Sequence, residues 1–369
     1  MTEKQNDVTS QDFIQTESQK TALFGLVNQR TEMDYANAVE FLACLPRFLR
    51  RKKNWARFTE VETAVLKFET THDHINYEIQ LSPATIERKN KEGKIEEIFI
   101  WPGEREEKVE SAIMRIASDG GLLQQATRTH QSSNKKPIYG CYFSVHRIQK
   151  ELEKIGKGAH PDDIKEAIEV MSKSALKIKS LSGNGQDIQE FSSAVFPQKY
   201  ISGKATGHRD DKCYVTFHPL LNAAIEAMSY RPYQFVEVER QKGLARYIHM
   251  RLMMRFSYAA DGRTYTLRVR KLLNDYGKLP SSEIITRAQL NNCGRDVNSA
   301  CNKLMTSNVL QKFTKKPIRK NGEIIDYEIT FFPHSNFSAS QLQNNKLNKM
   351  VQNAGKPQTP QLDLKDSLT

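Results

Sequence analysis

Four polar side chains between residues 288 and 304 recur at helical spacing. Asn291, Arg295, Asn298 and Asn302 fall on one stripe of a helix, and the apolar residues of the segment fall on another. Arginine can form paired hydrogen bonds with guanine, and asparagine can form them with adenine. Asparagine is a poor helix former, so its repeated use on an outer face needs another reason. The pattern predicts a helix that reads base edges, and the alternative is a polar face in water.

A cation-rich hairpin follows this helix directly. Its turn, "KNGE", contains Asn321-Gly322, the strongest short signal for two paired strands. Lysine and arginine beside a base-reading helix predict contacts to phosphates. The candidate DNA-binding residues of the helix and its start are Arg287, Asn291, Asn292, Arg295, Asn298, Asn302 and Lys303. Those of the hairpin are Lys312, Lys315, Lys316, Arg319 and Lys320.

The elements that would position these residues occur twice. "FSVHRIQKELEKIG" ends at Gly156 and "YTLRVRKLLNDYG" ends at Gly277, with apolar residues matching at one offset. A helix precedes each, at 103–118 and 239–257, and a second helix and a β-rich stretch follow. This order is that of a winged helix, whose second helix enters the major groove. Chance similarity between amphipathic helices is the alternative to a true repeat.

We therefore predict an α+β fold with two tandem winged-helix domains and disordered termini. Gly294 is expected in a tight turn between two helices, because glycine tolerates the backbone angles there. A helical stripe is expected from Tyr35 to Leu45, and a continuous helix from 236 to 258. The predicted parts are a disordered N-terminus at 1–20, a first winged-helix domain at 21–228, a second at 229–333 and a disordered tail at 334–369.

The second helix of the first copy differs from its counterpart in charge. Asp162, Asp163, Glu166 and Glu169 would be repelled by the phosphates along a groove. We therefore expect the first domain to serve dimerisation and auxiliary DNA contact, and the second to bind DNA sequence-specifically. The basic run "RFLRRKK" at 47–53 fits two interpretations, a helix C-terminus that favours cations or a phosphate-contacting patch.

The composition agrees with a polyanionic partner. The 369 residues include 55 Lys+Arg against 43 Asp+Glu, for a net charge of +12. No run of about 18 apolar residues occurs, so neither a membrane-spanning helix nor a membrane partner is expected. The N-terminus lacks the apolar core of a signal peptide. Five cysteines without C-x-x-C spacing predict reduced thiols, and a bacterial cytoplasm is the expected location.

Catalytic chemistry is not expected from the motifs. "THDHINYEI" holds His72 and His74 at the spacing of a metal-binding pair in rolling-circle initiators, but no Tyr-x-x-x-Lys partner accompanies them. Two surface histidines in a loop are expected instead, and "HRDDKC" at 208–213 is interpreted as a polar loop. No phosphate-binding loop, nucleophile elbow or zinc ligand set occurs. The chain is expected to be no enzyme and to need no cofactor or metal.

Two consecutive winged helices, the second more basic, give the chain a family resemblance. It rests on "FSVHRIQKELEKIG", "IKEAIEVMSKSALKI", "YTLRVRKLLNDYG", "VNSACNKLMTSNVLQKF" and "NGEIIDYEITF". Through these, residues 30 to 333 resemble the replication initiators of iteron-controlled bacterial plasmids. Members often open the recognition helix with an aromatic residue and several consecutive cations. This chain has "NNCGRDVNSACNK" there instead.

The resemblance implies a set of partners. The second winged helix would read repeated sites (iterons) in double-stranded origin DNA, and the first would serve dimerisation. Monomers would activate the origin and dimers restrain it, which is copy-number control. The host initiator DnaA and the replicative helicase would be recruited. Two alternatives stay open, a transcriptional repressor on the same scaffold and a strand-nicking initiator.

A short peptide in the tail suggests a further partner. Gln361, Leu362, Asp363 and Leu364 resemble the Gln-Leu-Ser/Asp-Leu-Phe peptide by which bacterial replication proteins dock on the sliding clamp. Lys365 stands where that peptide has its phenylalanine, so one apolar anchor is absent. The segment predicts a weak clamp contact, and a plain solvated tail is the alternative.

Overall fold

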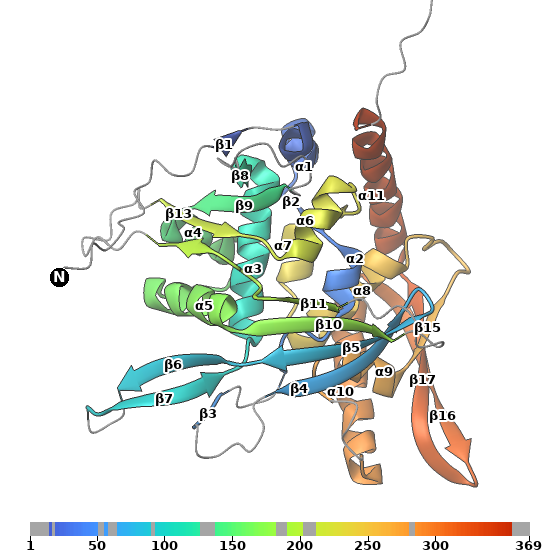
Figure 1. Ribbon diagram of the computed structural model, residues 1–369. Helices are drawn as coiled ribbons and strands as arrows, with labels where there is room; N and C mark the ends of the chain where they lie inside the picture. The colour runs from blue at the N-terminus through green and yellow to red at the C-terminus, as the bar shows by residue number, and fades with distance from the viewer. Residues whose placement is uncertain are drawn as a thin grey trace, which may run out of the picture.

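Two winged-helix units follow one another along the chain (Figure 1). The computed structural model describes residues 15–16, 19–50, 55–57, 65–89, 93–125, 137–181, 190–201, 212–279 and 285–355. Both units show the predicted order of helix, strand, helix, helix and further strands. The predicted α+β fold with tandem winged helices is therefore confirmed.

The first unit extends from α3 to β11. Ser144 begins α4, because its side chain accepts a hydrogen bond from the backbone N–H of Arg147 at 3.1 Å. Pro161 occupies the first turn of α5, where its missing N–H costs nothing. The elements are α3 (Glu104–Ile116), β9 (Ile138–Phe143), α4 (Val145–Lys154), α5 (Pro161–Lys173), β10 (Ala175–Leu181) and β11 (Glu190–Ser193).

The second unit extends from α8 to β17. Strand β17 lies between β15 and β16 in one antiparallel sheet. Asn321 and Gly322 both have positive φ, as a two-residue hairpin turn requires, so the predicted turn is confirmed. The elements are α8 (Gly243–Arg255), β15 (Tyr265–Arg268), α9 (Val269–Asp275), α10 (Arg287–Thr306), β16 (Leu310–Lys320) and β17 (Glu323–Pro333).

Further strands surround the first unit. One sheet has the order β11-β10-β5-β4, a second β3-β7-β6, a third β1-β8-β9-β13-β12, and β14 pairs with β2. Their bounds are β1 (Gln15–Thr16), β2 (Tyr35–Ala38), β3 (Trp55–Arg57), β4 (Leu66–His72), β5 (Ile75–Ser82), β6 (Ala84–Lys89), β7 (Ile95–Ile100), β8 (Leu122–Gln125), β12 (Lys199–Tyr200), β13 (Cys213–Thr216) and β14 (Arg231–Gln234). The other helices are α1 (Gln19–Arg30), α2 (Glu40–Cys44), the π-helical turn Ala117–Gly121, α6 (Pro219–Glu226), α7 (Phe235–Glu239) and α11 (Ser335–Ala354).

One hydrophobic core runs through both units. It includes Ile113 of α3, Ile148 of α4, Leu252 of α8 and Val297 of α10, each at most 1% exposed. Polar contacts cross the same boundary, since the Thr70 hydroxyl of β4 donates to the Asp275 carboxylate of α9 at 2.8 Å. The two winged helices are therefore packed against each other rather than joined only by a linker.

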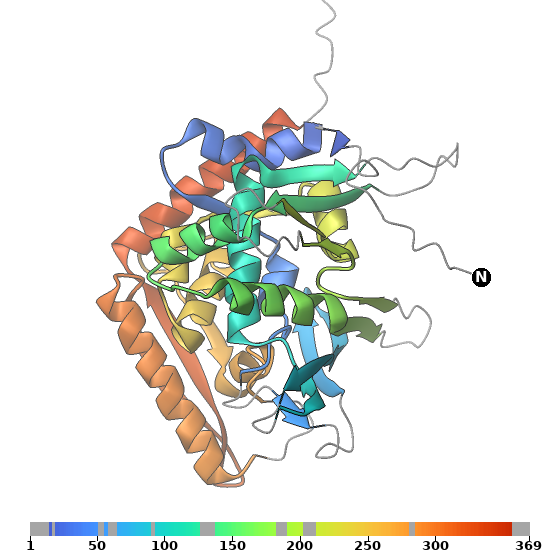
Figure 2. The same ribbon diagram turned by 90° about the vertical axis from the view of Figure 1, so that its left-hand side faces the viewer.

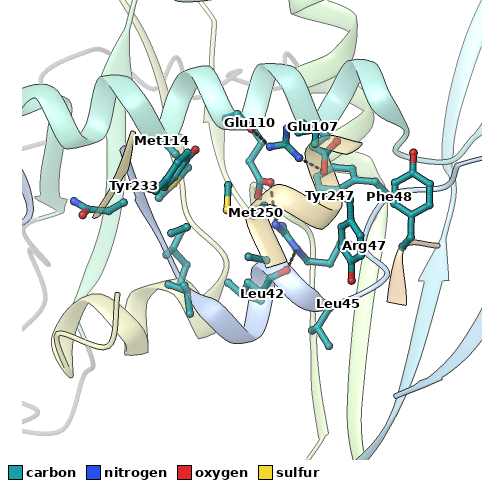
Figure 3. A pocket seen from close by; sticks show the side chains of 18 of the residues that line it. Leu42, Leu45, Arg47, Phe48, Glu107, Glu110, Met114, Tyr233, Tyr247 and Met250 are labelled. Carbon is teal, nitrogen blue, oxygen red and sulfur yellow. Dashed lines mark hydrogen bonds and ion pairs between the residues drawn. The ribbon is translucent and has the colours of Figure 1, made fainter. Parts of the chain in front are cut away.

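Buried ion pairs line a cavity of about 80 Å³ beside this boundary (Figure 3). Arg47 pairs with Glu110 at 2.7 Å, and Arg50 pairs with Glu107. Arg246 of α8 also contacts Glu107, at 2.6 Å. The first cations of the basic run at 47–53 are thus engaged inside the protein, and 51–53 lie outside the described residues. The helix C-terminus interpretation holds for Arg47, whose Nε donates to the Leu42 carbonyl in the last turn of α2 at 2.8 Å, and neither interpretation holds for Arg50.

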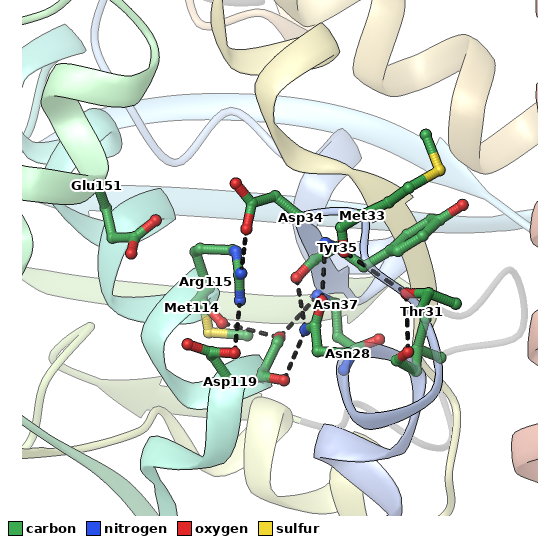
Figure 4. A network of polar contacts seen from close by, with 12 residues as sticks. Asn28, Thr31, Met33, Asp34, Tyr35, Asn37, Met114, Arg115, Asp119 and Glu151 are labelled. Atoms are coloured by element: carbon green, nitrogen blue, oxygen red, sulfur yellow. Dashed lines mark hydrogen bonds and ion pairs between the residues drawn. The ribbon is translucent and has the colours of Figure 1, made fainter.

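The helical stripe predicted from Tyr35 to Leu45 is wrong in its first half, which forms β2. Asn28 of α1 fixes this strand (Figure 4). Its Nδ2 donates to the carbonyls of Tyr35 at 2.8 Å and Ser118 at 2.7 Å, and its Oδ1 accepts from the Tyr35 N–H at 2.9 Å. Hydrogen bonds from distant residues thus override the local apolar spacing.

Two further helix predictions need correction. Gly294 lies inside α10, not in a turn, because the segment 287–306 is one 20-residue helix. The continuous helix predicted for 236–258 is divided into α7 and α8, and Gly243 at the break has a φ of +56°. That left-handed backbone angle is open to glycine and ends helical continuity.

The tail predicted to be disordered is wrong for residues 335–354, which form α11. Its Asn- and Gln-rich composition is compatible with folding because the amides bond to backbone. Gln341 is buried, and its Nε2 donates to the carbonyls of Leu252 and Met253, both at 3.0 Å. Residues 356–369, with Gln361, Leu362 and Leu364, lie outside the described part, as do 1–14 and 17–18; residues 19–20 belong to α1.

Candidate nucleic-acid interface

Helix α10 and the β16–β17 hairpin, here called the wing, lie side by side along one flank of the molecule (Figure 2). A capping box starts α10, in which the Thr286 hydroxyl accepts from the Gln289 N–H at 3.2 Å and the Gln289 side chain accepts from the Thr286 N–H at 2.7 Å. One stripe of α10 is buried and faces the core: Leu290, Cys293, Gly294, Val297, Ala300, Cys301 and Leu304.

The predicted base-reading residues lie largely on the opposite face. Arg287, Asn291, Asn292, Arg295, Asn302 and Lys303 are exposed. Asn298 is only half-buried, and its Oδ1 has no hydrogen-bond partner among the described residues. The Arg295 guanidinium hydrogen-bonds to the Asn292 side-chain oxygen. The structure thus brings most of the predicted stripe together, with Asn298 at its edge beside the buried side.

The wing distributes its cations over two faces. Cross-strand partners share a face, so Lys315, opposite buried Ile329, points to the α10 side. Lys312 and Lys316, opposite Phe332 and Glu328, point to the other side of the sheet. Lys312 lies over the Phe332 ring, 4.5 Å from its centroid. Five wing cations therefore do not form one surface.

The cations nearest the hairpin turn are Arg319 and Lys320. Both are exposed, and the Arg319 guanidinium donates to the Gly322 carbonyl at 3.0 Å. A wing tip of this kind can reach the phosphates beside the groove that the helix occupies. Among the wing cations predicted to contact phosphates, Arg319 and Lys320 are therefore in the best position to do so.

A contact that the sequence did not reveal joins the wing to α10. The Tyr327 hydroxyl of β17 donates to Oδ1 of Asn291 at 2.8 Å. The Lys315 ammonium donates to the carbonyl of Gly294 at 3.2 Å and lies 4.8 Å from the centroid of the Tyr327 ring. Burial lowers the pKa of Lys315. The alternation of Tyr327, Ile329 and Phe331 on one strand face was the only signal that could have located Tyr327.

The corresponding helix of the first unit, α5, is covered. Val170 of α5 is fully buried in a cluster with Ala84 and Ile86 of β6 and Ile98 and Ile100 of β7. Figure 1 shows β6 and β7 projecting beneath α5. A helix covered by a sheet on this side cannot lie along a DNA groove with the same face.

The acids of α5 are also partly neutralised. Glu166 pairs with Arg105 at 2.9 Å and with Arg88. Glu169 pairs with Lys173 at 2.9 Å and with Lys199. Two of the four acids that we expected to repel phosphates are therefore paired, and Asp162 and Asp163 stay exposed. Coverage by β6 and β7 adds a second physical reason against groove binding by α5.

The histidines at 72–74 are not two surface side chains in a loop. His72 ends β4 with its side chain 12% exposed, and its ring contacts the Arg255 guanidinium and, at 3.2 Å, the Asp73 carboxylate. Burial and then Arg255 lower the pKa of His72. Glu40, His72 and Asp73 could together offer three ligand atoms to a metal, but Arg255 already places a cation against this group, with its Nε 3.4 Å from Glu40.

Comparison with known proteins gave structural likenesses only. No family model matches the sequence, and no curated protein matches it. Two crystal structures of domains 2 and 3 of RctB superpose with TM-scores of 0.44, at 12% and 11% identity; they cover 85% and 82% of this chain and 98% and 99% of theirs. The Pi initiator protein in complex with iteron DNA superposes with a TM-score of 0.38, at 10% identity, over 63% of this chain and 91% of that one.

In the described part of the chain, no helix is both long and apolar enough to cross a bilayer.

Proposed function

We propose that this chain is a replication initiator that binds repeated sites in double-stranded DNA. The observation that carries the proposal is the joint placement of Asn291, Arg295 and Asn302 on the exposed face of α10, with an adjoining cationic wing. An exposed helix with arginine and asparagine side chains can reach base edges in the major groove, and the wing can contact phosphates. The net charge of +12 would strengthen and steer binding to DNA.

The chain acts by binding, without catalytic chemistry or a cofactor. The strand-nicking alternative would need a metal held by paired histidines, yet His72 is occupied by Arg255 and Asp73, and His74 sits in the following turn with a φ of +66°. A repressor would use the same interface with DNA. The initiator and the repressor therefore differ in the DNA that they bind, an array of repeated sites or a single operator over a promoter. The sequence resemblance favours the initiator.

The finer parts of the proposal concern partners. The chain would associate with itself through the first unit, with monomers active and dimers restraining copy number. The host initiator DnaA and the replicative helicase would be recruited in a bacterial cytoplasm. The sliding clamp would bind Gln361, Leu362 and Leu364. The proposal of these partners is based on the sequence resemblance and, for the sliding clamp, on the peptide "QLDL".

The test begins with selection of duplexes from a randomised pool by the full chain. An initiator should recover one preferred site, and arrays of that site should lie beside an A·T-rich segment next to its gene. On that site, Arg295→Ala should cost about 1–3 kcal/mol at one base pair. Recovery of no preferred site would contradict the proposal. A single operator over a promoter, without an array, would favour the repressor.

A further inference from the structure

The wing contacts one of the candidate base-reading residues on the flank of α10 that faces it. Asn291 is exposed, and its Oδ1 accepts the hydrogen bond from the Tyr327 hydroxyl at 2.8 Å. Its Nδ2 makes no hydrogen bond to any described residue. The Tyr327 hydroxyl therefore fixes the orientation of this amide, and Nδ2 together with the second lone pair of Oδ1 is available to a ligand.

Lys315 and Gly294 support this contact. The Lys315 ammonium lies 4.8 Å from the Tyr327 ring centroid and is anchored to the Gly294 carbonyl at 3.2 Å. A cation over a phenol ring draws electron density from it, which makes the hydroxyl a better hydrogen-bond donor. Tyr327 accordingly donates to the amide oxygen rather than accepting from the amide nitrogen.

Gly294 provides the space for this arrangement. A Cβ at this position would lie 3.0 Å from the Lys315 Nζ and 3.6 Å from the Tyr327 ring. Gly294 itself is buried on the stripe of α10 that packs toward the wing. We call Asn291, Gly294, Lys315 and Tyr327 the wing–helix clasp.

We propose that Tyr327 is a positioning residue for base recognition by Asn291, and that the base read is the adenine of an A·T pair. This inference rests on the proposed function. An unrestrained asparagine exchanges its oxygen and nitrogen by a flip of the amide, with little change in shape. Adenine presents a donor and an acceptor in a fixed order in the major groove, so only one amide orientation matches it. The Tyr327 hydroxyl selects one orientation before DNA arrives and spares that ordering cost on binding.

The clasp also changes the role assigned to Lys315. Its ammonium is directed to a helix carbonyl and an aromatic ring instead of to solvent. It therefore acts on base preference through Tyr327, while Arg319 and Lys320 at the wing tip contact phosphates. The two groups of wing residues should have different salt dependences, because only phosphate contacts release counterions.

The experiment measures binding of full-length variants to the selected site and to duplexes with each base pair changed in turn. Tyr327→Phe should lower the preference at one A·T pair about five- to tenfold, within the range of a single good contact. Asn291→Ala should lower the preference at the same pair, and the double variant should lose no more than Asn291→Ala alone. Affinity for random duplex and the salt slope should stay at wild-type values. Tyr258→Phe, which removes a hydroxyl from an exposed tyrosine, is the matched control and should behave as wild type.

Three outcomes would overturn the inference while leaving the proposed function in place. The first is that Tyr327→Phe keeps every base preference. The second is that the double variant loses more preference than Asn291→Ala alone. The third is that Tyr327→Phe weakens binding to all duplexes equally. A preference at a G·C pair would overturn the assignment of adenine. If wild-type protein selects no sequence at all, the proposed function itself fails, and the inference fails with it.

Discussion

At the scale of single residues, Gly294 shows what a sequence pattern leaves open. Its position between two predicted helices indicated a tight turn, in which glycine tolerates the backbone angles. The structure shows a helical glycine whose missing Cβ admits Lys315 and Tyr327. Those neighbours lie more than 20 residues away in the chain, so no local pattern could distinguish a need for space from a need for special backbone angles.

Gly294→Ala should separate stability from base preference. Alanine is favoured over glycine inside a helix by about 0.5–1 kcal/mol, and the Lys315 ammonium, at the end of a flexible chain, can move from the new methyl group. We expect an unchanged or raised Tm together with a weaker preference at the base pair that Asn291 reads. Thermal unfolding and the duplex panel measure the two effects, with Ser299→Ala on the exposed face of α10 as control. A Tm lowered by several degrees would show that the site has no room.

His218 makes stability dependent on pH. Its Nδ1 accepts the hydrogen bond from the Leu220 N–H that begins α6, at 3.1 Å, which requires the neutral ring. Burial, and then Arg47, lower its pKa to about 4. The unfolded chain therefore binds this proton more readily, so the stabilisation is complete above pH 6.5 and is lost as pH falls toward 4.

Urea unfolding at pH 7.5 and pH 5 measures this loss. Each buried histidine of this type should contribute a decrease of roughly 2 kcal/mol in unfolding free energy between the two values. His249 is also buried and has a pKa of about 4, so it contributes a second decrease in unfolding free energy of the same size. His218→Asn keeps an N-cap acceptor but does not titrate, and should remove about half of the decrease. An identical decrease in the variant would show that His218 does not titrate as described.

At the scale of elements, local signals predicted the α10–wing pair, and composition gave a wrong prediction for α11. The α10–wing pair was predictable because its apolar spacing and its Asn-Gly turn are local signals. Helix α11 was not, because a segment rich in Asn, Gln and Ser resembles a disordered tail. What folds it is tertiary: Phe337 and Val351 are buried, and Asn345 donates from Nδ2 to the Ser257 carbonyl at 2.8 Å.

Gln341→Ala should destabilise the protein through the end of α8. Without the amide, the carbonyls of Leu252 and Met253 lose a buried donor each, at a cost of about 1–3 kcal/mol. Gln343→Ala, two residues along the same helix on its exposed face, is the matched control and should change the unfolding free energy little. Chemical denaturation compares the two variants. Equal effects would mean that α11 does not cap α8 in solution.

At the scale of the whole molecule, the two units share one hydrophobic core. The sequence predicted a boundary near residue 228 because each repeat could be recognised separately. The structure has a shared core and an ion-pair cluster in which Glu107 of α3 meets Arg50 and Arg246. Burial opposes the charge of Glu107, but the two arginines outweigh it and lower its pKa to about 2. Such coupling depends on packing between repeats, which neither repeat displays alone.

Glu107→Gln should destabilise both units together. The change leaves the buried Arg50 guanidinium without its carboxylate, at a cost of about 3–5 kcal/mol, while Arg246 keeps its pair with Glu239 at 2.6 Å. Calorimetry should show a single unfolding transition at lower temperature. Glu104→Gln is the control, because its pair with Lys108 at 2.9 Å is exposed and such pairs contribute at most about 1 kcal/mol. Two separate transitions in either variant would contradict a common core.

We propose that α10, and not α5, enters the groove of the DNA. All five native cysteines are buried, so a cysteine introduced at an exposed position can carry a DNA-cleaving reagent selectively. Ser299 of α10 and Asp163 of α5 are both exposed and lie in equivalent helices, so each is replaced by cysteine in turn. On the selected duplex, the reagent at 299 should cut within the repeated site, and the reagent at 163 should not. Cleavage within the site from 163 but not from 299 would show that α5, and not α10, lies in the groove.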